Sequence, residues 1–384
     1  MKGNFRKQLY FVIVFLLLFY VIEIPTDFLK SKIRLLLLPE NNIILNMKTY
    51  PEDFSLLCPD GSSPIILEVC AYDLNHDPFP FLLIHVELNN FQGKIEPSYP
   101  ITNKDGKCLI YVYPNSIYIT DKSDDNLVEA SIKLYSTKSI SANYQVRLTS
   151  LPILLVHGFQ DTSESFVPLK QHLENNGFIV YSIDYSTETD LDTMSTELGD
   201  TISLMKTQLK EKGIYTSKID IVAHSLGGLV SRYYTTEQSY IEKQDVRKLI
   251  FINVPHHGTP WAEAGAKLLN SPFLKQLYPT SSLFASTFPN LINKGLNHNI
   301  QVANIALEND EVVPLPSTSL NLWNIETKVY RIGAEPLTME SILQSQVYGG
   351  SRHRQLLFYK PVFEDILSYL TKDLTYPQKR SNSY

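Results

Sequence analysis

One serine marks the point at which an apolar run gives way to a helical pattern. Residues 219–224 are Ile-Asp-Ile-Val-Ala-His, and after Ser225 the chain continues as Leu-Gly-Gly-Leu-Val. A strand that turns directly into a helix strains the backbone of the residue at the turn and leaves room only for small neighbours. Ala223 occupies a position where glycine is usual in such turns, and Gly227 supplies the other small residue. The segment therefore predicts a strand, a tight turn and a helix, with the hydroxyl of Ser225 exposed at the helix N-terminus.

Apolar runs of strand length alternate with helical patterns on both sides of this turn. Such runs, bounded by turn signals, are typical of strands that are buried on both faces. Strands that alternate with helices predict an α/β fold, in which helices cover both faces of a mostly parallel sheet. We expect strands at residues 151–156, 178–183, 248–254, 300–307 and 328–332, and helices at residues 191–212 and 361–370.

Four segments in this part of the chain form a recognisable set. They are Val156-His157-Gly158-Phe159, Ala223-His224-Ser225-Leu226-Gly227-Gly228, Pro255-His256-His257-Gly258-Thr259-Pro260 and Asp310-Glu311-Val312-Val313-Pro314. Together they resemble motifs of the α/β-hydrolases of the lipase and esterase type, close to the branch that includes the GPI inositol-deacylase-like enzymes. The resemblance covers residues from about 151 to 370. It implies an α/β-hydrolase catalytic domain at residues 149–372 that uses a serine nucleophile.

An acid and a histidine are expected to follow the serine in the chain, because this fold carries its triad in the order serine, acid, histidine. Asp310 follows an apolar run and precedes Val-Val-Pro, where a strand end would present a carboxylate; the alternatives are Glu308 and Glu311. His353 is the only histidine downstream of Asp310. We therefore expect Ser225 to be the nucleophile, His353 the general base and Asp310 the residue that orients the imidazole.

Two backbone amides are expected to bind the oxyanion that forms in such a reaction. One belongs to Leu226, directly after the nucleophile, and the other to Phe159 in the loop after an early strand. No metal is expected, because adjacent histidines such as His256 and His257 point in different directions and no further ligand lies at the right spacing. No cofactor is expected, because no phosphate-cradling glycine loop follows any of the strands.

The first residues combine a basic stretch with an apolar run. Lys2, Arg6 and Lys7 precede residues 9–22, which carry no charge. The run is shorter than the about 20 residues of a membrane-spanning helix, and it fits the apolar part of a secretory signal peptide. No small-x-small cleavage motif follows, so an uncleaved anchor is an equal alternative. We expect residues 1–28 to be a signal peptide or an N-terminal membrane anchor, with membrane association through residues 9–22 and export of the remainder.

Residues 43–148 differ in pattern from the rest of the chain. Turn-forming groups separate short strand-like runs, which predict an all-β sandwich; these runs lie at 65–72, 81–88, 107–113 and 128–135. Bacterial immunoglobulin-like domains of the invasin type are similar to three of its segments, and the likeness implies a spacer or adhesive module; the segments are 60–64, 72–79 and 102–107. All three cysteines fall in this region, and three thiols allow at most one internal disulfide. Residues 373–384 are expected to form a flexible tail.

Apolar segments between residues 261 and 296 suit a cap over Ser225, and ordinary helices that pack on the sheet are an equal alternative. We therefore expect a serine carboxylester hydrolase that cleaves acyl esters, lipid-like ones above all, through an acyl-enzyme. Two alternatives stay open: a cell-surface adhesion protein with a non-catalytic hydrolase fold, and an acyltransferase or thioesterase that uses the same triad. The net charge of −6 and the pI of about 5.9 argue against a nucleic-acid partner. The oligomeric state is not predicted.

Overall fold

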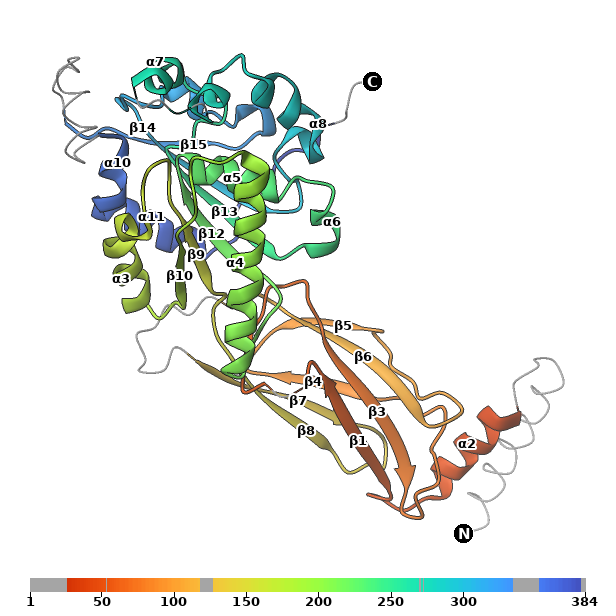
Figure 1. Ribbon diagram of the computed structural model, residues 1–384. Coiled ribbons are helices and arrows are strands. Elements are labelled where there is room, and N and C mark those ends of the chain that lie inside the picture. The colour runs from red at the N-terminus through yellow and green to blue at the C-terminus, as the bar shows by residue number, and fades with distance from the viewer. Residues whose placement is uncertain are drawn as a thin grey trace, which may run out of the picture. The chain divides into compact units, whose positions relative to one another are not determined.

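The computed structural model describes residues 26–52, 54–117, 127–268, 271, 273–333 and 352–380 (Figure 1). These residues form two compact units. The first unit is built from the described residues up to 52, from 61 to 115 and from 129 to 146, and the second contains the other described residues. The apolar run at residues 9–22, with the signal peptide or anchor expected there, lies outside the described residues. None of the described helices is long and apolar enough to cross a membrane.

The first unit is built from antiparallel strands that follow one short helix, α2 (Thr26–Leu37). Four strands pair in the order β1-β3-β6-β5, and the strands β8, β7 and β4 lie next to one another in that order. Alternate side chains of β3, β6 and β7 are buried, as expected for strands with one face toward a core. The strands are β1 (Ile43–Tyr50), β3 (Ile65–Asp73), β4 (His85–Asn89), β5 (Gly93–Glu96), β6 (Lys107–Pro114), β7 (Val128–Tyr135) and β8 (Ala142–Leu148).

This arrangement fits the expected all-β region, whose immunoglobulin-like character stays a prediction. The run expected as a strand at 81–88 forms a regular strand only from His85, because Phe81 adopts a positive φ of 56° in a turn. Cys58, Cys70 and Cys108 are all free thiols.

The second unit contains a six-stranded sheet in which every neighbouring pair is parallel. The strand order is β10-β9-β12-β13-β14-β15, so the strand that leads to Ser225 is near the centre. Every residue of β9, β12, β13 and β14 is buried, as the continuous apolar runs predict. The predicted α/β-hydrolase fold is thus confirmed. The strands are β9 (Ile153–Val156), β10 (Val180–Ile183), β12 (Ile219–His224), β13 (Val246–Ile252), β14 (Gln301–Leu307) and β15 (Thr327–Tyr330).

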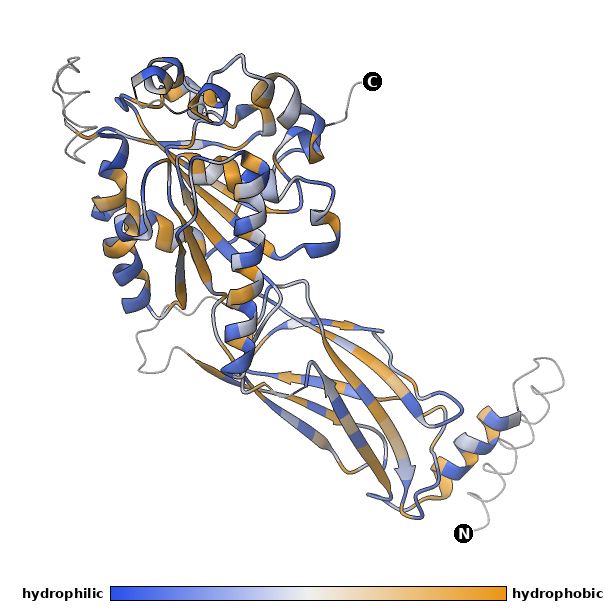
Figure 2. Cartoon of the chain, in the orientation of Figure 1, coloured by the Kyte–Doolittle hydropathy of each residue, from blue (hydrophilic) through white to orange (hydrophobic). Residues whose placement is uncertain are grey.

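Helices cover both faces of this sheet, because successive residues of each strand point to opposite sides. Leu154 and Val156 of β9 pack in one core with α4 and α5, whereas Ile153 and Leu155 pack in a second core with α3 and α11. Figure 2 shows the strands as mainly apolar and α4 with polar residues along its length. These helices are α3 (Val167–Asn175), α4 (Leu191–Glu211), α5 (Leu226–Tyr234) and α11 (Lys360–Leu370).

Short elements complete the second unit. Strands β2 (Leu56–Cys58) and β11 (Ile214–Thr216) form a small parallel pair. The apolar segment after β13 breaks into several short helices: α7 (Trp261–Leu268), η2 (Phe273–Leu277), η3 (Leu283–Thr287), α8 (Phe288–Asn290) and η4 (Ile292–Lys294). The remaining short helices are η1 (Ser163–Phe166), α6 (Tyr240–Lys243), η5 (Leu315–Thr318), η6 (Asn321–Trp323), α10 (Arg352–Gln355) and η7 (Leu356–Phe358).

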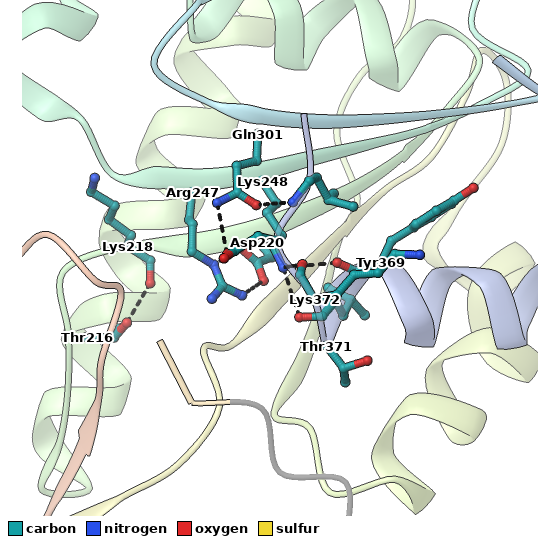
Figure 3. A network of polar contacts seen from close by, with 12 residues as sticks. Thr216, Lys218, Asp220, Arg247, Lys248, Gln301, Tyr369, Thr371 and Lys372 are labelled. Carbon is teal, nitrogen blue, oxygen red and sulfur yellow. Dashed lines mark hydrogen bonds and ion pairs between the residues drawn. The ribbon is translucent and has the colours of Figure 1, made fainter. Parts of the chain in front are cut away.

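A polar network joins the sheet to the end of α11 at the N-terminal ends of three strands (Figure 3). Arg247 donates from Nε to the buried carboxylate of Asp220 over 2.9 Å. The amino group of Lys248 donates to the backbone oxygens of Tyr369, Leu370 and Lys372 over 2.7–3.0 Å. Burial and the positive charge of nearby Arg247 together lower the pKa of Lys248 to about 8. A buried cation at the last carbonyls of α11 stabilises that helix end.

The C-terminal segment up to Arg380 is held on the second unit, which corrects the expectation of a flexible tail from residue 373. The amide of Leu374 donates to Oε1 of Gln301 on β14 over 2.7 Å. Farther along, the amide of Gln378 donates to the backbone oxygen of Trp323 over 2.8 Å. The polar composition of the segment did not reveal these partners, because they lie on elements distant in sequence.

Candidate active site

The turn between β12 and α5 strains the backbone at Ser225. This residue has φ 51° and ψ −123°, a conformation that L-residues rarely adopt. Its amide donates to the backbone oxygen of Ile252 on the neighbouring strand over 3.0 Å. A Cβ at Gly227 would lie 2.4 Å from the backbone oxygen of His157, so no larger residue fits at that position. Ala223 fits in place of glycine, with its methyl group fully buried in the core.

Three side chains that are distant in sequence form one hydrogen-bonded row. The hydroxyl of Ser225 lies 2.7 Å from Nε2 of His353, and Nδ1 of the same ring lies 2.6 Å from Oδ2 of Asp310. All three side chains are buried. In this arrangement Nδ1–H donates to the carboxylate, and the lone pair of Nε2 can accept the hydroxyl proton. The structure therefore brings the three predicted residues together.

A turn after β14 fixes the carboxylate of Asp310. Its Oδ1 accepts the amides of Val312 and Val313 over 2.8 and 2.9 Å, which leaves Oδ2 for the imidazole. The two alternatives have other contacts. Glu308 pairs with Arg331 at the surface, and Oε1 of Glu311 accepts the backbone amide of His353 over 3.4 Å, not the ring.

His353 lies on α10 in a negatively charged environment. Burial lowers the pKa of its imidazole, but the carboxylates of Asp310, Glu311 and Asp161 outweigh this effect and raise the pKa above that of a free histidine. The shift favours the imidazolium that forms when the ring takes a proton from serine. The ring is therefore suited to general-base chemistry.

The loop after β9 lies against the serine. A Cβ at Gly158 would be only 3.0 Å from Cβ of Ser225, so this close approach favours glycine. Tyr185 donates its hydroxyl to the backbone oxygen of His157 over 2.7 Å and thereby braces the loop. The next residue, Phe159, lines the same cavity as Leu226 at the N-terminus of α5.

The two amides predicted to bind an oxyanion are free to do so. Within the described chain, neither the amide of Phe159 nor that of Leu226 has a hydrogen-bond acceptor. The amide of Leu226 is one of the first N–H groups of a helix, which lack partners inside the helix and favour negative charge.

A cavity of about 150 Å³ opens beside Ser225 and His353. Apolar residues make up half of its lining. Phe159 stacks on Phe273 of η2 with ring centroids 6.3 Å apart. The predicted cap thus contributes to the cavity through its first helices. The apolar lining residues are Phe159, Leu226, Pro255, Trp261, Leu274, Leu277, Val312 and Val313.

Charged and polar side chains that the sequence did not single out also surround the triad. Asp161 and Arg354 line the cavity and form an ion pair with a distance of 3.0 Å. Asn253 and His224 both contact the backbone oxygen of His353. Asn253 and His224 lie directly at the ends of β13 and β12, but ordinary polar residues also lie at strand ends, so this position alone did not identify them.

The paired histidines of the Pro-His-His-Gly motif serve other contacts. His256 is buried beside Arg232, whose Nη1 lies 3.2 Å from its Nδ1. Its neighbour His257 donates from Nε2 to the backbone oxygen of Ser319 over 2.9 Å. In the part of the chain that the structure describes, no group of histidine, cysteine and carboxylate side chains could hold a metal ion.

Comparison with known proteins relates the chain to lipases at low identity. Residues 127–278 match a family described as a domain of unknown function (DUF7379). A triacylglycerol lipase of Pseudarthrobacter phenanthrenivorans is 24% identical over 211 residues, which are 53% of this chain and 62% of that protein. A triacylglycerol lipase of Burkholderia plantarii is 24% identical over 211 residues, covering 53% of this chain and 55% of that protein. The matched region therefore spans less than two thirds of either relative.

Solved structures of lipases also resemble the chain. The mature lipase BlEst2 of Bacillus licheniformis is 17% identical, covering 56% of this chain and 91% of that one, with a TM-score of 0.38. A soluble variant of monoglyceride lipase from Saccharomyces cerevisiae is 16% identical, covering 67% of this chain and 95% of that one, with a TM-score of 0.39. The α/β architecture of this chain is evident from its own parallel sheet, with the strand order β10-β9-β12-β13-β14-β15.

Proposed function

We propose that this protein is a serine carboxylester hydrolase of the lipase and esterase type. The observation that carries the proposal is the hydrogen-bonded row of Ser225, His353 and Asp310. Beside it lie the amides of Phe159 and Leu226, which have no acceptor among the described residues. A nucleophile, a base and two donors for an oxyanion are the groups that acyl transfer needs. The similarity to triacylglycerol lipases supports the same reaction class.

Each group has one task in this reaction. The hydroxyl oxygen of Ser225 attacks the acyl carbonyl while Nε2 of His353 takes its proton. The amides of Phe159 and Leu226 donate to the oxyanion, and Asp310 holds the imidazolium. The proton then passes from His353 to the leaving alcohol, which departs and leaves the acyl-enzyme. A water molecule then attacks the carbonyl of the acyl-enzyme while His353 takes its proton. The proton passes to Ser225 as the carboxylic acid is released.

The apolar cavity supports a substrate with an apolar acyl group. Its volume of about 150 Å³ is close to that of cavities that hold a benzene ring, so it accepts a short acyl chain or the first carbons of a longer one. We therefore propose lipid-like acyl esters as substrates. Esters whose acyl group carries a charge would lose solvation on entering this cavity and are expected to react poorly.

A fluorophosphonate probe tests the nucleophile directly, because it phosphonylates an activated serine. The native protein should be labelled, and the Ser225→Ala variant should not. Asp310→Asn should lower kcat by roughly 10³- to 10⁴-fold on a chromogenic ester because the imidazole loses its orientation and charge partner. Equal labelling of the native protein and of Ser225→Ala would contradict the proposal.

A panel of p-nitrophenyl esters of increasing acyl length, with and without detergent micelles, tests the substrate class. We expect kcat/KM to rise with each methylene that the cavity accepts and to fall for charged acyl groups. A protein that hydrolyses acetate and charged esters equally well and rejects longer chains would rule out the lipid-like substrate while leaving the esterase intact.

A further inference from the structure

Two side chains meet at the backbone carbonyl of His353. The nitrogen Nε2 of His224 lies 3.1 Å from that oxygen, and Nδ2 of Asn253 donates to it over 2.9 Å. His224 is the last residue of β12 and Asn253 directly follows β13. On the other side of the same residue, the amide of His353 donates to Oε1 of Glu311 over 3.4 Å. The backbone of His353 is therefore held on both sides.

The contact decides which nitrogen of His224 carries the hydrogen. A carbonyl oxygen only accepts, so Nε2 must be the donor and Nδ1 carries a lone pair if the ring is neutral. Burial and the charges of His353, Arg354 and His157 lower the pKa of His224 well below that of a free histidine. The hydrogen bond to His353 acts in the opposite direction but does not outweigh them. The lowered pKa of His224 and the raised pKa of His353 favour a neutral donor ring at residue 224 when His353 takes up its proton.

Neutrality matters because the two imidazoles are neighbours. Their ring centroids lie 4.7 Å apart with an interplanar angle of 43°. A positive charge on His224 would oppose the imidazolium that His353 forms when it takes the proton of Ser225. A neutral ring packs against His353 without that repulsion and still donates one hydrogen bond.

Asn253 is held as firmly as the histidine. It is fully buried with a φ of 49°, and its own amide donates to the backbone oxygen of Ile305 over 2.9 Å. Its Oδ1 accepts the amide of Leu307 over 2.7 Å, which assigns the oxygen and leaves Nδ2 to donate to His353. The side chain therefore connects the end of β14 to the backbone of the catalytic histidine.

We propose that His224 and Asn253 are positioning residues, whose two hydrogen bonds to the carbonyl of His353 keep its imidazole in line between Ser225 and Asp310. The inference rests on the proposed function. Neither side chain transfers a proton, because their donors act on a backbone oxygen. A displacement of about 1 Å at the imidazole lowers the rate by up to about 100-fold, which sets the scale of the expected effect.

Substitutions at His224 separate its hydrogen bond from its packing. His224→Phe keeps an aromatic ring without a donor, and His224→Gln restores a neutral N–H donor. We expect His224→Phe to lower kcat and the rate of fluorophosphonate labelling by about 10- to 100-fold with KM within about twofold, and His224→Gln to recover most of the loss. His257→Phe is the matched control, since it removes a similar ring-to-carbonyl hydrogen bond away from the triad and should keep full activity.

The pH profile of kcat/KM separates positioning from proton transfer. The pH at which kcat/KM falls to half on the acid side is set by the ionisation of His353. Because His224 stays neutral, its replacement should leave this pH unchanged. Native kcat in His224→Phe, or equal losses in His224→Phe and His224→Gln at the same melting temperature, would overturn the proposal. Loss of the acid limb in either variant would make His224 the base and overturn it as well.

The protonation state of His224 offers a test that does not depend on activity. In a sample labelled with ¹⁵N-histidine, NMR should show the imidazole of His224 in the neutral Nε2–H form through the pH range in which His353 titrates. Loss of its signal in His224→Gln identifies it among the buried histidines. An Nδ1–H or protonated ring at residue 224 would contradict the proposal. If His224 showed one of these forms in an enzyme that still hydrolyses esters, the positioning role would fail while the proposed function would stand. The failure of one proposal can therefore be told from the failure of the other.

Discussion

Asp161 lies two residues after Phe159, and its carboxylate pairs with Arg354, the residue next to His353. Nη2 of Arg354 is 3.0 Å from Oδ1 of Asp161, which also accepts the amide of Thr162 over 2.9 Å. The side chain of Asp161 is only 10% exposed, so water screens the pair weakly. The ion pair thus links the loop of Phe159, the proposed oxyanion donor, to the helix of His353, the proposed base.

Breaking this link should lower the rate more than the stability. We expect Asp161→Asn to reduce kcat by about tenfold, because the loop and the histidine are no longer held in register. Kinetics and thermal unfolding of the variant check this. Glu308→Gln, which breaks the surface pair with Arg331, is the matched control and should leave kcat unchanged. Full activity in Asp161→Asn would show that the pair has no part in the alignment.

The acid limb of kcat/KM should lie above the pH at which a free histidine titrates, about 6.5. The carboxylates around His353 raise its pKa against the effect of burial, so the ring gains its proton, and activity is lost, at a higher pH as the solution is acidified. Glu311→Gln removes one of these charges and should move the limb to lower pH. A limb that stays in place would mean that Glu311 is already protonated in the active enzyme, in keeping with the raised pKa that burial gives it.

The close approach of Gly158 to Ser225 predicts a rate effect without a large loss of stability. A methyl group at this position would lie 3.0 Å from Cβ of Ser225 and would displace the loop that carries Phe159. We expect Gly158→Ala to lower kcat and the labelling rate by about 100-fold. Gly228→Ala provides the contrast, because its methyl group would lie 2.2 Å from Cγ2 of buried Val254 and should instead lower the melting temperature.

The cavity should set the preferred acyl length. Leu277 is buried and lines the cavity, so Leu277→Ala should enlarge it and shift the optimum to chains longer by about one to two methylenes, each worth about 0.8 kcal/mol. The ester panel measures the shift. Leu283→Ala removes the same atoms from a buried leucine that does not line the cavity, and its optimum should match that of the native protein.

Local patterns were sufficient to predict the sheet and the serine turn. The apolar runs around Ile221 and Leu249 specify buried parallel strands, and the small residues after Ser225 specify the turn. Chain order then left Asp310 and His353 as the best partners. These features follow from short stretches of sequence and from the connectivity of the fold.

The residues that hold the triad in place could not be predicted in the same way. The contacts of Asn253 and His224 with the carbonyl of His353, and that of Asp161 with Arg354, join segments more than 90 residues apart. Nothing in the local pattern separates such a residue from an ordinary polar residue at a strand end. The C-terminal segment shows the same limit, since its polar composition gives no sign of Gln301 or Trp323.

The anchoring of residues 374–380 has a practical consequence for engineering the protein. A stop codon placed before Leu374 would remove Thr375, whose backbone oxygen accepts the amide of Val302 on β14 over 2.9 Å. It would also remove Leu374 and Tyr376, which hydrogen-bond to the side chain of Gln301. Expression vectors should therefore retain residues 374–380, and affinity tags should be placed after Arg380.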